Sequence, residues 1–258
     1  MGDLLDVLDR AVRTLTEGKE IAVAFSGGLD SSVVAVLAGK YAGSIRLYTV
    51  GEEDSQDVRA SKEMCQHLGI EWEHIPMDEE SLVRGLRESI RITGTVDPVT
   101  LSFEVPLMYI LPYVREKYVI GGQGADEVFW GYSKYLDLSE QELREQSERD
   151  FRTLESVTLP HESKMAARYG KIILYPYLDD EVRRTVSSMD FEYRRPVGDD
   201  RKRPLKDAAA EIGRPEIAER TKKAAQYGTG SMNMIKRLAK KAGLSVSEYI
   251  QSLGGADD

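Results

Sequence analysis

The stretch Phe25-Ser26-Gly27-Gly28-Leu29-Asp30-Ser31-Ser32 decides the fold, because it joins one apolar run to another. The preceding residues 20–25 predict a short buried strand, and residues 33–38 predict a buried helix that reaches Tyr41. The two adjacent glycines have no Cβ atoms, so the backbone can turn sharply and a ligand can come close. The sequence therefore predicts a strand, a glycine loop and a helix in direct succession.

The residues that open this helix are suited to binding an anion. Ser31 and Ser32 would lie at the helix start, where free backbone N–H groups and the positive end of the helix dipole attract phosphate. Asp30 is an acid within this anion site, which is understandable if a metal ion bridges its carboxylate to the phosphates. The chain has no G-x-x-x-x-G-K-S/T run, so this is not the common nucleotide loop.

A second glycine-rich turn follows another predicted strand. Residues 118–120 are apolar, and residues 121–132 read Gly-Gly-Gln-Gly-Ala-Asp-Glu-Val-Phe-Trp-Gly-Tyr. A strand end, glycines and an acid at a helix start are combined again, which predicts a second backbone cradle opposite the first. Asp126 is then placed to hold the same metal ion as Asp30 from the other side, an arrangement typical of Mg²⁺ on a polyphosphate.

The first stretch resembles the pyrophosphate loop of the ATP pyrophosphatases, and the second resembles the Gly-Ala-Asp-Glu-Leu/Val-Phe-x-Gly-Tyr segment of asparagine synthetase. The resemblance to the synthetase domain of that family covers residues 20–228, with looser matches at 150–179, 201–208 and 215–223. It implies an α/β fold with a doubly wound, mainly parallel sheet. Residues 1–135 would form the ATP pyrophosphatase core, and residues 136–258 a helical region that packs on the core and completes the site.

The resemblance also implies cofactors and a set of site residues. ATP and Mg²⁺ would be the cofactors, with the metal ion between the two aspartates. Lys202 would neutralise the phosphates or the transition state, and Lys206 and Arg203 are the alternatives because the match is loose there. The predicted catalytic residues are thus Lys202, Gln123 and Asp126. The predicted nucleotide-binding residues are Ser26, Gly27, Gly28, Leu29, Asp30, Ser31, Ser32, Val50, Gly51, Gly122 and Lys206.

Val50 and Gly51 are included because of their place in the chain. They end the strand predicted at residues 45–50, and the carboxyl ends of strands frame the ligand crevice of a doubly wound sheet. Backbone contacts from these two residues would line an adenine pocket.

Two departures from the family pattern shape the functional prediction. The family carries an N-terminal glutaminase domain with a terminal cysteine nucleophile, whereas the lone cysteine here, Cys65, is internal. We therefore expect the amine to come from solution or from a separate glutaminase subunit. The family usually has Glu at the position of Gln123, and an amide cannot act as a general base. Either the base lies elsewhere or the substrate differs.

Composition and charge narrow the class of protein. The chain has 258 residues, of which 41% are hydrophobic and 31% charged, as in soluble globular proteins. No apolar run approaches the ~20 residues that span a membrane, and a single cysteine fits the cytosol, so we expect a cytoplasmic protein without membrane contact. Residues 194–241 hold 14 Lys and Arg against 6 Asp and Glu, although the whole chain carries −9. This basic segment suits a polyphosphate or a nucleic acid.

Three functional hypotheses follow. In the leading one, a small-molecule carboxylate attacks the α-phosphorus of ATP to form an acyl-adenylate, and an amine such as ammonia displaces AMP to give an amide. In the second, a tRNA-modifying enzyme of the same superfamily adenylates an RNA base and holds the RNA on the basic segment. In the third, which Gln123 would permit, the chain is a non-catalytic nucleotide-binding subunit.

Three further expectations concern local structure. An apolar helix is predicted at residues 103–113. Glu104 in this helix is either a substrate contact or an acid of the first turn, and the first-turn acid is the favoured interpretation. Residues 150–178 are expected to be helical by their resemblance to the family. Residues 224–230 are expected to form a hinge or a lid.

Overall fold

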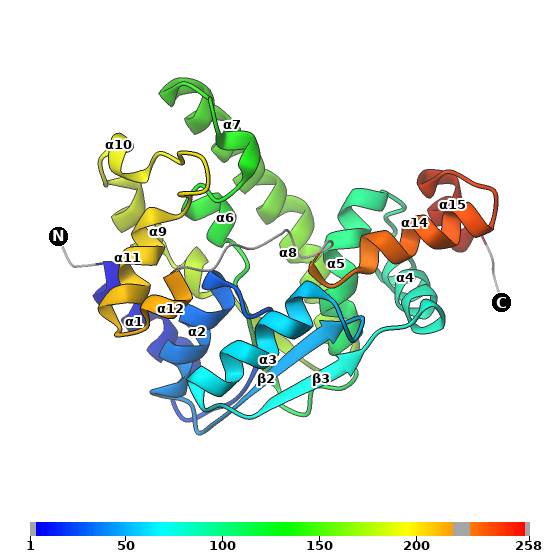
Figure 1. The fold of residues 1–258 in the computed structure, drawn as a ribbon, viewed down its shortest axis with the longest axis horizontal. Helices are drawn as coiled ribbons and strands as arrows, with labels where there is room; N and C mark the ends of the chain where they lie inside the picture. The colour runs from blue at the N-terminus through cyan, green and yellow to red at the C-terminus, as the bar shows by residue number, and fades with distance from the viewer. Residues whose placement is uncertain (1–3, 219–227, 256–258) are drawn as a thin grey trace.

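A five-stranded parallel sheet lies at the centre of the computed structural model, which describes residues 4–218 and 228–255 (Figure 1). The strands lie in the order β3-β2-β1-β4-β5, and every neighbouring pair is parallel. The predicted doubly wound parallel sheet is confirmed. The strands are β1 (Glu20–Ala24), β2 (Ser44–Gly51), β3 (Trp72–Pro76), β4 (Tyr118–Ile120) and β5 (Ile172–Leu174).

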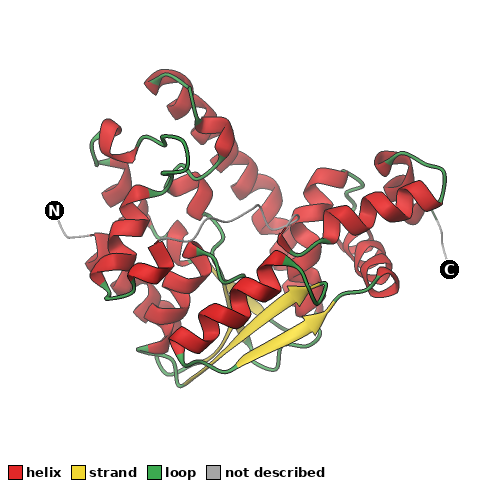
Figure 2. Ribbon diagram, in the orientation of Figure 1, coloured by secondary structure: helices red, strands yellow, loops and turns green. Residues whose placement is uncertain are grey.

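Helices surround the sheet and connect its strands (Figure 2). The α-helices are α1 (Leu4–Thr16), α2 (Leu29–Gly39), α3 (Gln56–Leu68), α4 (Glu79–Thr93), α5 (Pro98–Ile110), α6 (Ala125–Val128), α7 (Glu140–Thr153), α8 (Leu159–Arg168), α9 (Asp180–Ser187), α10 (Phe191–Arg194), α11 (Arg203–Glu211), α12 (Pro215–Ala218), α14 (Ser231–Lys241) and α15 (Val246–Gly254). Two 3₁₀ turns, η1 (Ser133–Tyr135) and η3 (Pro176–Leu178), and a π-helical turn, η2 (Leu154–Thr158), complete the helical segments.

Two apolar layers hold the helices against the sheet. One layer packs α1, α2, α9 and α11 against one face through side chains such as Leu37. The other packs α4, α5, α8, α14 and α15 against the opposite face through side chains such as Val105. Because both faces are covered, β1 is apolar on both sides, with Ile21 in the first layer and Ala22 in the second.

The strand order places the two glycine stretches beside each other. The chain runs outward from β1 to β3 and then returns to build β4 and β5 on the other side. β1 pairs directly with β4, with Val23 opposite Ile120. The loops after these strands, residues 25–28 and 121–124, therefore share the carboxyl edge of the sheet at its topological switch point, where ligands bind in open α/β sheets.

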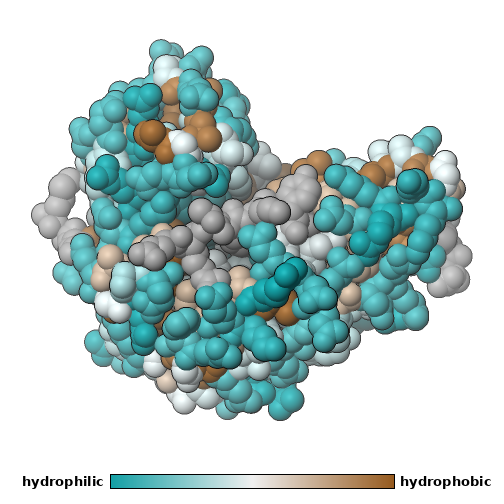
Figure 3. Space-filling model, viewed as in Figure 1, coloured by the Kyte–Doolittle hydropathy of each residue, from teal (hydrophilic) through white to brown (hydrophobic). Residues whose placement is uncertain are grey.

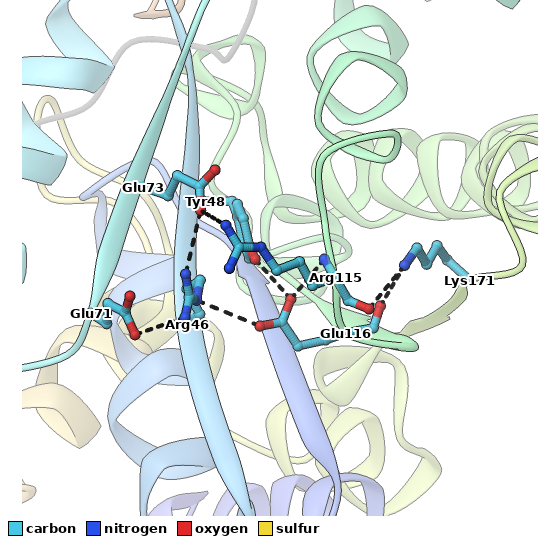
Figure 4. A network of polar contacts seen from close by, with 7 residues as sticks. All are labelled: Arg46, Tyr48, Glu71, Glu73, Arg115, Glu116 and Lys171. Atoms are coloured by element: carbon cyan, nitrogen blue, oxygen red, sulfur yellow. Dashed lines mark hydrogen bonds and ion pairs between the residues drawn. The ribbon is translucent and has the colours of Figure 1, made fainter.

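The amino edge of the sheet is joined by a network of paired charges (Figure 4). Arg46 contacts Glu71 at 2.9 Å, Glu73 at 3.5 Å and Glu116 at 3.7 Å. The Lys171 ammonium donates to the backbone carbonyl of Glu116 at 2.9 Å. These residues lie near or just before the starts of β2, β3, β4 and β5, so the network links the strands at the edge away from the glycine loops.

The apolar helix predicted at residues 103–113 begins earlier, as α5. The Asp97 carboxylate caps it by accepting a hydrogen bond from the Thr100 N–H at 2.7 Å, and Pro98 occupies the first helical position. Glu104 therefore lies beyond the first turn. The interpretation of Glu104 as a first-turn acid is wrong, because the cap lies outside the apolar run on which the helix was predicted.

The segment at residues 150–178 is not wholly helical, because it contains β5. Gly170 follows α8 with a φ of 66°, in the left-handed region that favours glycine, and three residues then pair with β4. Of the predicted hinge or lid, residues 224–227 lie outside the described residues, and residues 228–230 lead into α14. The predicted division between residues 135 and 136 stays a prediction.

The surface shown in Figure 3 is mostly hydrophilic. It is hollowed between the lobe that carries α7 and α10 and the lobe that carries α14 and α15. Within residues 4–218 and 228–255, no helix is long and apolar enough to cross a membrane.

Candidate active site

A buried lysine joins the two glycine stretches. The Lys202 ammonium lies 2.7 Å from Oδ2 of Asp30 and 2.8 Å from Oδ1 of Asp126. Asp30 stands in the first turn of α2, Asp126 in the first turn of α6, and Lys202 directly before α11. Lys202 is only 9% exposed, so the contact is shielded from solvent. Three elements that are distant in the sequence thus bring three predicted site residues to one point.

The two aspartates keep Lys202 charged. Burial alone would lower the pKa of the Lys202 ammonium, but the negative charges of Asp126 and Asp30 outweigh burial and raise that pKa above its ordinary value. Lys202 also has a φ of 58°, a left-handed conformation that is uncommon for any residue but glycine. Strained backbone of this kind is held by its surroundings and is concentrated at functional sites.

Two glycines make room for these charged side chains. A Cβ atom on Gly131 would lie 2.0 Å from Cε of Lys202 and 2.1 Å from Oδ1 of Asp126. A Cβ atom on Gly122 would lie 2.6 Å from Cβ of Asp30. All three distances are far below van der Waals contact, so a larger residue at either position would displace the site. Gln123 follows Gly122 in the same turn after β4.

Serine side chains shape the first glycine loop. The Ser26 N–H donates to Oγ of Ser31 at 3.2 Å, and the Ser31 hydroxyl donates to the Gly28 carbonyl at 3.4 Å. Gly28 is the N-cap residue of α2, and no side chain in the described part of the chain caps this helix end. The first backbone N–H groups of α2 are therefore not occupied by a side-chain cap, as at helix starts that bind anions, and the predicted phosphate-binding role of this loop stays a prediction. The Tyr177 hydroxyl donates to the Asp30 carbonyl at 2.8 Å and fixes the helix start.

The end of β2 is tied to its neighbours. The Gly51 carbonyl accepts a hydrogen bond from the Met77 N–H at 3.1 Å and lies 3.1 Å from Nε2 of His74. The N–H of the next residue donates to the Thr229 carbonyl at 3.2 Å, which links this edge to the segment before α14. Val50 is buried at the same strand end. A role of Val50 and Gly51 in binding adenine stays a prediction.

The alternative cations for the site are engaged elsewhere. The Lys206 ammonium lies 2.8 Å from Oδ1 of Asp200, and the Arg203 guanidinium lies 5.4 Å from the ring centre of Tyr193. Of the three cations considered from the sequence, Lys202 is the one that contacts both site aspartates. A nucleotide-binding role of Lys206 stays a prediction.

The two aspartates fit a metal ion that also binds phosphates. Oδ1 of Asp30 is buried without a hydrogen-bond partner among the described residues, and Asp30 and Asp126 already share one cation. Within that part of the chain, no group of three or more His, Cys, Asp or Glu side chains could hold a metal ion alone. Mg²⁺ usually takes one or two carboxylates and fills its remaining positions with waters and substrate phosphates. The residues present therefore suit Mg²⁺ bound together with a polyphosphate.

A buried acidic cluster that the sequence did not predict lies at the same edge. Oε1 of Glu104 is 2.6 Å from Nδ1 of His161, and the neighbouring Glu162 is 7% exposed. Glu127 accepts a hydrogen bond from the Tyr132 hydroxyl at 2.7 Å, and burial raises the pKa of Glu127 to about 7. An acid inside an apolar helix is a visible signal at Glu104, but only the tertiary contacts reveal that these acids are buried together.

The fold and the site together define a class of protein. It is a doubly wound α/β protein whose switch point carries a phosphate-suited loop and a lysine held by two aspartates. The family model of asparagine synthase matches residues 3–146 and 136–249. The chain therefore belongs to the asparagine synthase family, and the predicted resemblance is confirmed.

Named relatives are similar to this chain over part of their length. A Methanocaldococcus jannaschii protein provisionally named a glutamine-hydrolysing asparagine synthetase is 29% identical over 294 residues, which cover 96% of this chain and 54% of that protein. The glutamine-hydrolysing asparagine synthetase of Homo sapiens is 28% identical over 178 residues, which cover 65% of this chain and 32% of that protein. The chain thus spans 54% and 32% of the length of these two relatives.

Among solved structures, the NMN synthetase of Francisella tularensis is similar over 99% of this chain and 84% of that chain, with a TM-score of 0.46 and 15% identity. A likeness this distant bears on neither the substrate nor the reaction.

Proposed function

We propose that the protein is an ATP-dependent carbon–nitrogen ligase that activates a small-molecule carboxylate as an acyl-adenylate and transfers the acyl group to an amine. The products would be an amide, AMP and pyrophosphate. The observation that carries the proposal is the convergence of Asp30, Asp126 and Lys202 at the switch point of the sheet. Family membership supports the same chemistry, because the relatives are named asparagine synthetases. Aspartate is therefore the first carboxylate to test.

The loop at residues 26–32 would bind the phosphates of ATP through the free backbone N–H groups at the start of α2. Asp30 and Asp126 would hold Mg²⁺ against these phosphates. A bound Mg²⁺ would offset the charge that builds up on pyrophosphate as it leaves.

Lys202 supplies a permanent positive charge beside the phosphates. Because the pKa of Lys202 is raised, its ammonium stays protonated at neutral pH. A cation in a site shielded from water stabilises developing negative charge more strongly than it would in bulk solvent. Lys202 would therefore stabilise the transition state in which a carboxylate oxygen bonds to the α-phosphorus. The bond from that phosphorus to the bridging oxygen breaks, and pyrophosphate leaves with the electron pair.

The second half-reaction needs an amine. Gln123 stands where the family usually has an acid, and its amide cannot accept the proton of the attacking amine. We propose that the nitrogen is free ammonia or ammonia delivered by a separate glutaminase subunit, in the cytoplasm. Ammonium chloride and glutamine, supplied separately, distinguish these two sources.

Nucleic acid is the less favoured substrate. Within the basic C-terminal segment, Arg237 contacts Glu52 at 2.6 Å and Lys241 contacts Glu79 at 2.7 Å. Such pairs neutralise part of the positive charge that an RNA backbone would need. The small-molecule reaction is therefore the one that we propose.

Identification of the products is the direct test. The purified protein is incubated with Mg-ATP, a panel of carboxylates that includes aspartate, and either ammonium chloride or glutamine. We expect AMP, pyrophosphate and an amide in equal amounts with at least one acid. Formation of ADP and phosphate would contradict the proposal. Binding of ATP without turnover under every nitrogen source would instead favour a non-catalytic nucleotide-binding subunit.

A further inference from the structure

The buried acids of α5 and α8 lie at the same edge of the sheet as the nucleotide loop. α5 leads into β4 and α8 leads into β5, so each helix runs antiparallel to the strand that follows and begins at the carboxyl edge. Glu104 lies in the middle of α5, and His161 and Glu162 lie in the first turn of α8. Figure 1 shows these two helices side by side, and both belong to the same apolar layer. The acids are therefore placed beside the candidate active site.

These acids are buried with unpaired oxygens. Glu104 is 2% exposed and Glu162 is 7% exposed. Among the described residues, neither forms an ion pair with Lys or Arg, and the partner of Glu104 is His161. Oε2 of each carboxyl group is buried without a hydrogen-bond partner in that part of the chain. The hydroxyl of Tyr175, just after β5, is buried beside Glu162 and interacts with that carboxyl group and with Ser163, so it belongs to the same cluster.

Each of these carboxyl groups still has one oxygen that the surrounding protein leaves unpaired. Oε1 of Glu104 pairs with His161, and Tyr175 forms a hydrogen bond with Glu162, but Oε2 of both acids is buried without a partner among the described residues, which costs free energy. A protonated amine would satisfy them, because it brings a positive charge and several N–H donors to the carboxylate and hydroxyl oxygens. An anion such as a phosphate or a second carboxylate would be repelled. The described residues also offer no group of ligands that could hold a metal ion alone.

The cluster continues toward the nucleotide site. Glu127 follows Asp126 in α6. Burial is the main cause that raises the pKa of Glu162, and the charges of Glu104 and Glu127 raise that pKa further. The acids thus connect the middle of α5 with the aspartate that contacts Lys202. A group bound among them would lie next to the reacting phosphates.

We infer that Glu104, His161, Glu162 and Tyr175 form a subsite for a protonated amine carried by one of the two substrates. The inference rests on the proposed ligase function and adds the charge class of a substrate. Either the nucleophile enters as an ammonium ion, or the activated carboxylate belongs to an amino acid whose ammonium group lies in this subsite.

Isotope exchange between pyrophosphate and ATP shows which of the two substrates carries the amine. The exchange requires adenylation of the acid but no nucleophile. Exchange is measured with aspartate and glutamate and with succinate and glutarate, which lack the amino group. If the acceptor supplies the amine, the wild-type protein has a KM at least about tenfold lower for the amino acids, and Glu162→Gln removes that preference. If the nucleophile supplies it, Glu162→Gln raises the KM for ammonium in amide formation by about tenfold, with the KM for ATP unchanged.

A second variant and a matched control show whether the effect is specific to the subsite. Glu104→Gln should reproduce the effect of Glu162→Gln from the neighbouring helix. Glu116→Gln removes a carboxyl group that is also mostly buried, but at the amino edge, and should leave both KM values unchanged. Circular dichroism and thermal unfolding confirm that each variant is folded.

Two outcomes overturn the inference or separate it from the proposed function. If both KM values stay within about twofold in Glu162→Gln and Glu104→Gln, the acids are merely hydrated. If the wild-type protein shows no exchange with any acid, the proposed function has failed, and the subsite is tested by thermal unfolding in methylammonium chloride against sodium chloride at equal ionic strength. A methylammonium-specific rise in Tm that Glu162→Gln abolishes supports the subsite, and equal Tm values in the two salts overturn it.

Discussion

The carboxylates at the two edges of the sheet differ in their partners. At the amino edge, Arg46 contacts three glutamates, and Lys171 donates to the backbone beside them (Figure 4). At the carboxyl edge, one lysine serves Asp30 and Asp126. Glu104 and Glu162 have no Lys or Arg partner there among the described residues. Each of the three glutamates at the amino edge thus has an arginine partner, whereas Glu104 and Glu162 at the carboxyl edge have no Lys or Arg partner in the described part of the chain.

This difference separates what holds the fold from what receives a ligand. The acids of the amino edge already have partners within the protein. Removing one of the charges there should therefore change stability more than catalytic activity. The carboxyl edge gathers more negative charge than the protein neutralises, which costs folding free energy. Perturbed acids and strained backbone that persist at such a cost are typical of functional sites.

Removing the lysine that contacts both site aspartates should have the largest effect. Lys202→Met deletes the charge that faces both aspartates and the proposed phosphates. We expect kcat/KM for acid-dependent AMP formation to fall by about 10²–10³-fold, the usual cost of removing a group that stabilises transition-state charge. Pyrophosphate release measures the rate. Lys171→Met is the control, because it removes a lysine from the amino edge. This variant should keep its activity within about threefold, and any effect should be a lower Tm. Equal losses in both variants would refute the distinction between the edges.

The glycine between these charges gives a second, smaller test. Gly131→Ala places a methyl group 2.0 Å from Cε of Lys202 and 2.1 Å from Oδ1 of Asp126, so both side chains must move. We expect kcat/KM to fall by about 10²-fold without loss of the fold, because displacements of about 1 Å have costs of that size.

A helical glycine away from the site is the matched control. A Cβ atom on Gly85 in α4 would meet only Cδ2 of Tyr109 at 3.6 Å, which is ordinary contact. Gly85→Ala should keep full activity and gain up to about 1 kcal/mol of stability, because alanine favours the helix. Normal pyrophosphate release by Gly131→Ala would show that the lysine and the aspartates need not be held as the structure has them.

The same comparison shows what the sequence could predict. β1, α2 and the two glycine loops follow from local patterns of apolar residues and glycines, and the shared edge of the loops follows from the rules of doubly wound sheets. β5 was missed because residues 172–174 lie inside the segment that the resemblance to the family assigned to helix. Lys202 was found by resemblance alone, since its partner Asp30 lies 172 residues away.

The acidic cluster could not be predicted for a related reason. Glu104 and His161 are 57 residues apart, and nothing local to either reveals the other. A charge in a sequence does not show whether it will be solvated or buried, because burial depends on how distant helices pack. The network around Arg46 could not be predicted either, although Arg46 and Glu116 lie near the starts of two strands that the sequence did predict.

The pH dependence of stability offers the finest comparison of the two edges. Burial, opposed by Tyr175 and reinforced by Glu104 and Glu127, raises the pKa of Glu162 to about 8. In the unfolded chain this pKa would be about 4.3. The folded protein therefore holds a proton that the unfolded chain releases between these values. The stability contributed by this group is fully present below about pH 4 and is lost as the pH rises through about 8.

Glu162→Gln should flatten this decline, because its amide cannot ionise. We expect the Tm of the ligand-free wild-type protein to fall between about pH 5 and pH 8, and that of Glu162→Gln to fall less. Glu127, whose pKa is raised to about 7 chiefly by burial, acts in the same direction, so some decline should remain. Glu71→Gln at the amino edge removes an exposed acid paired with Arg46 and should keep the wild-type slope. Scanning calorimetry over this range decides the point: parallel curves for Glu162→Gln and the wild type would mean that the carboxyl edge carries no stability cost.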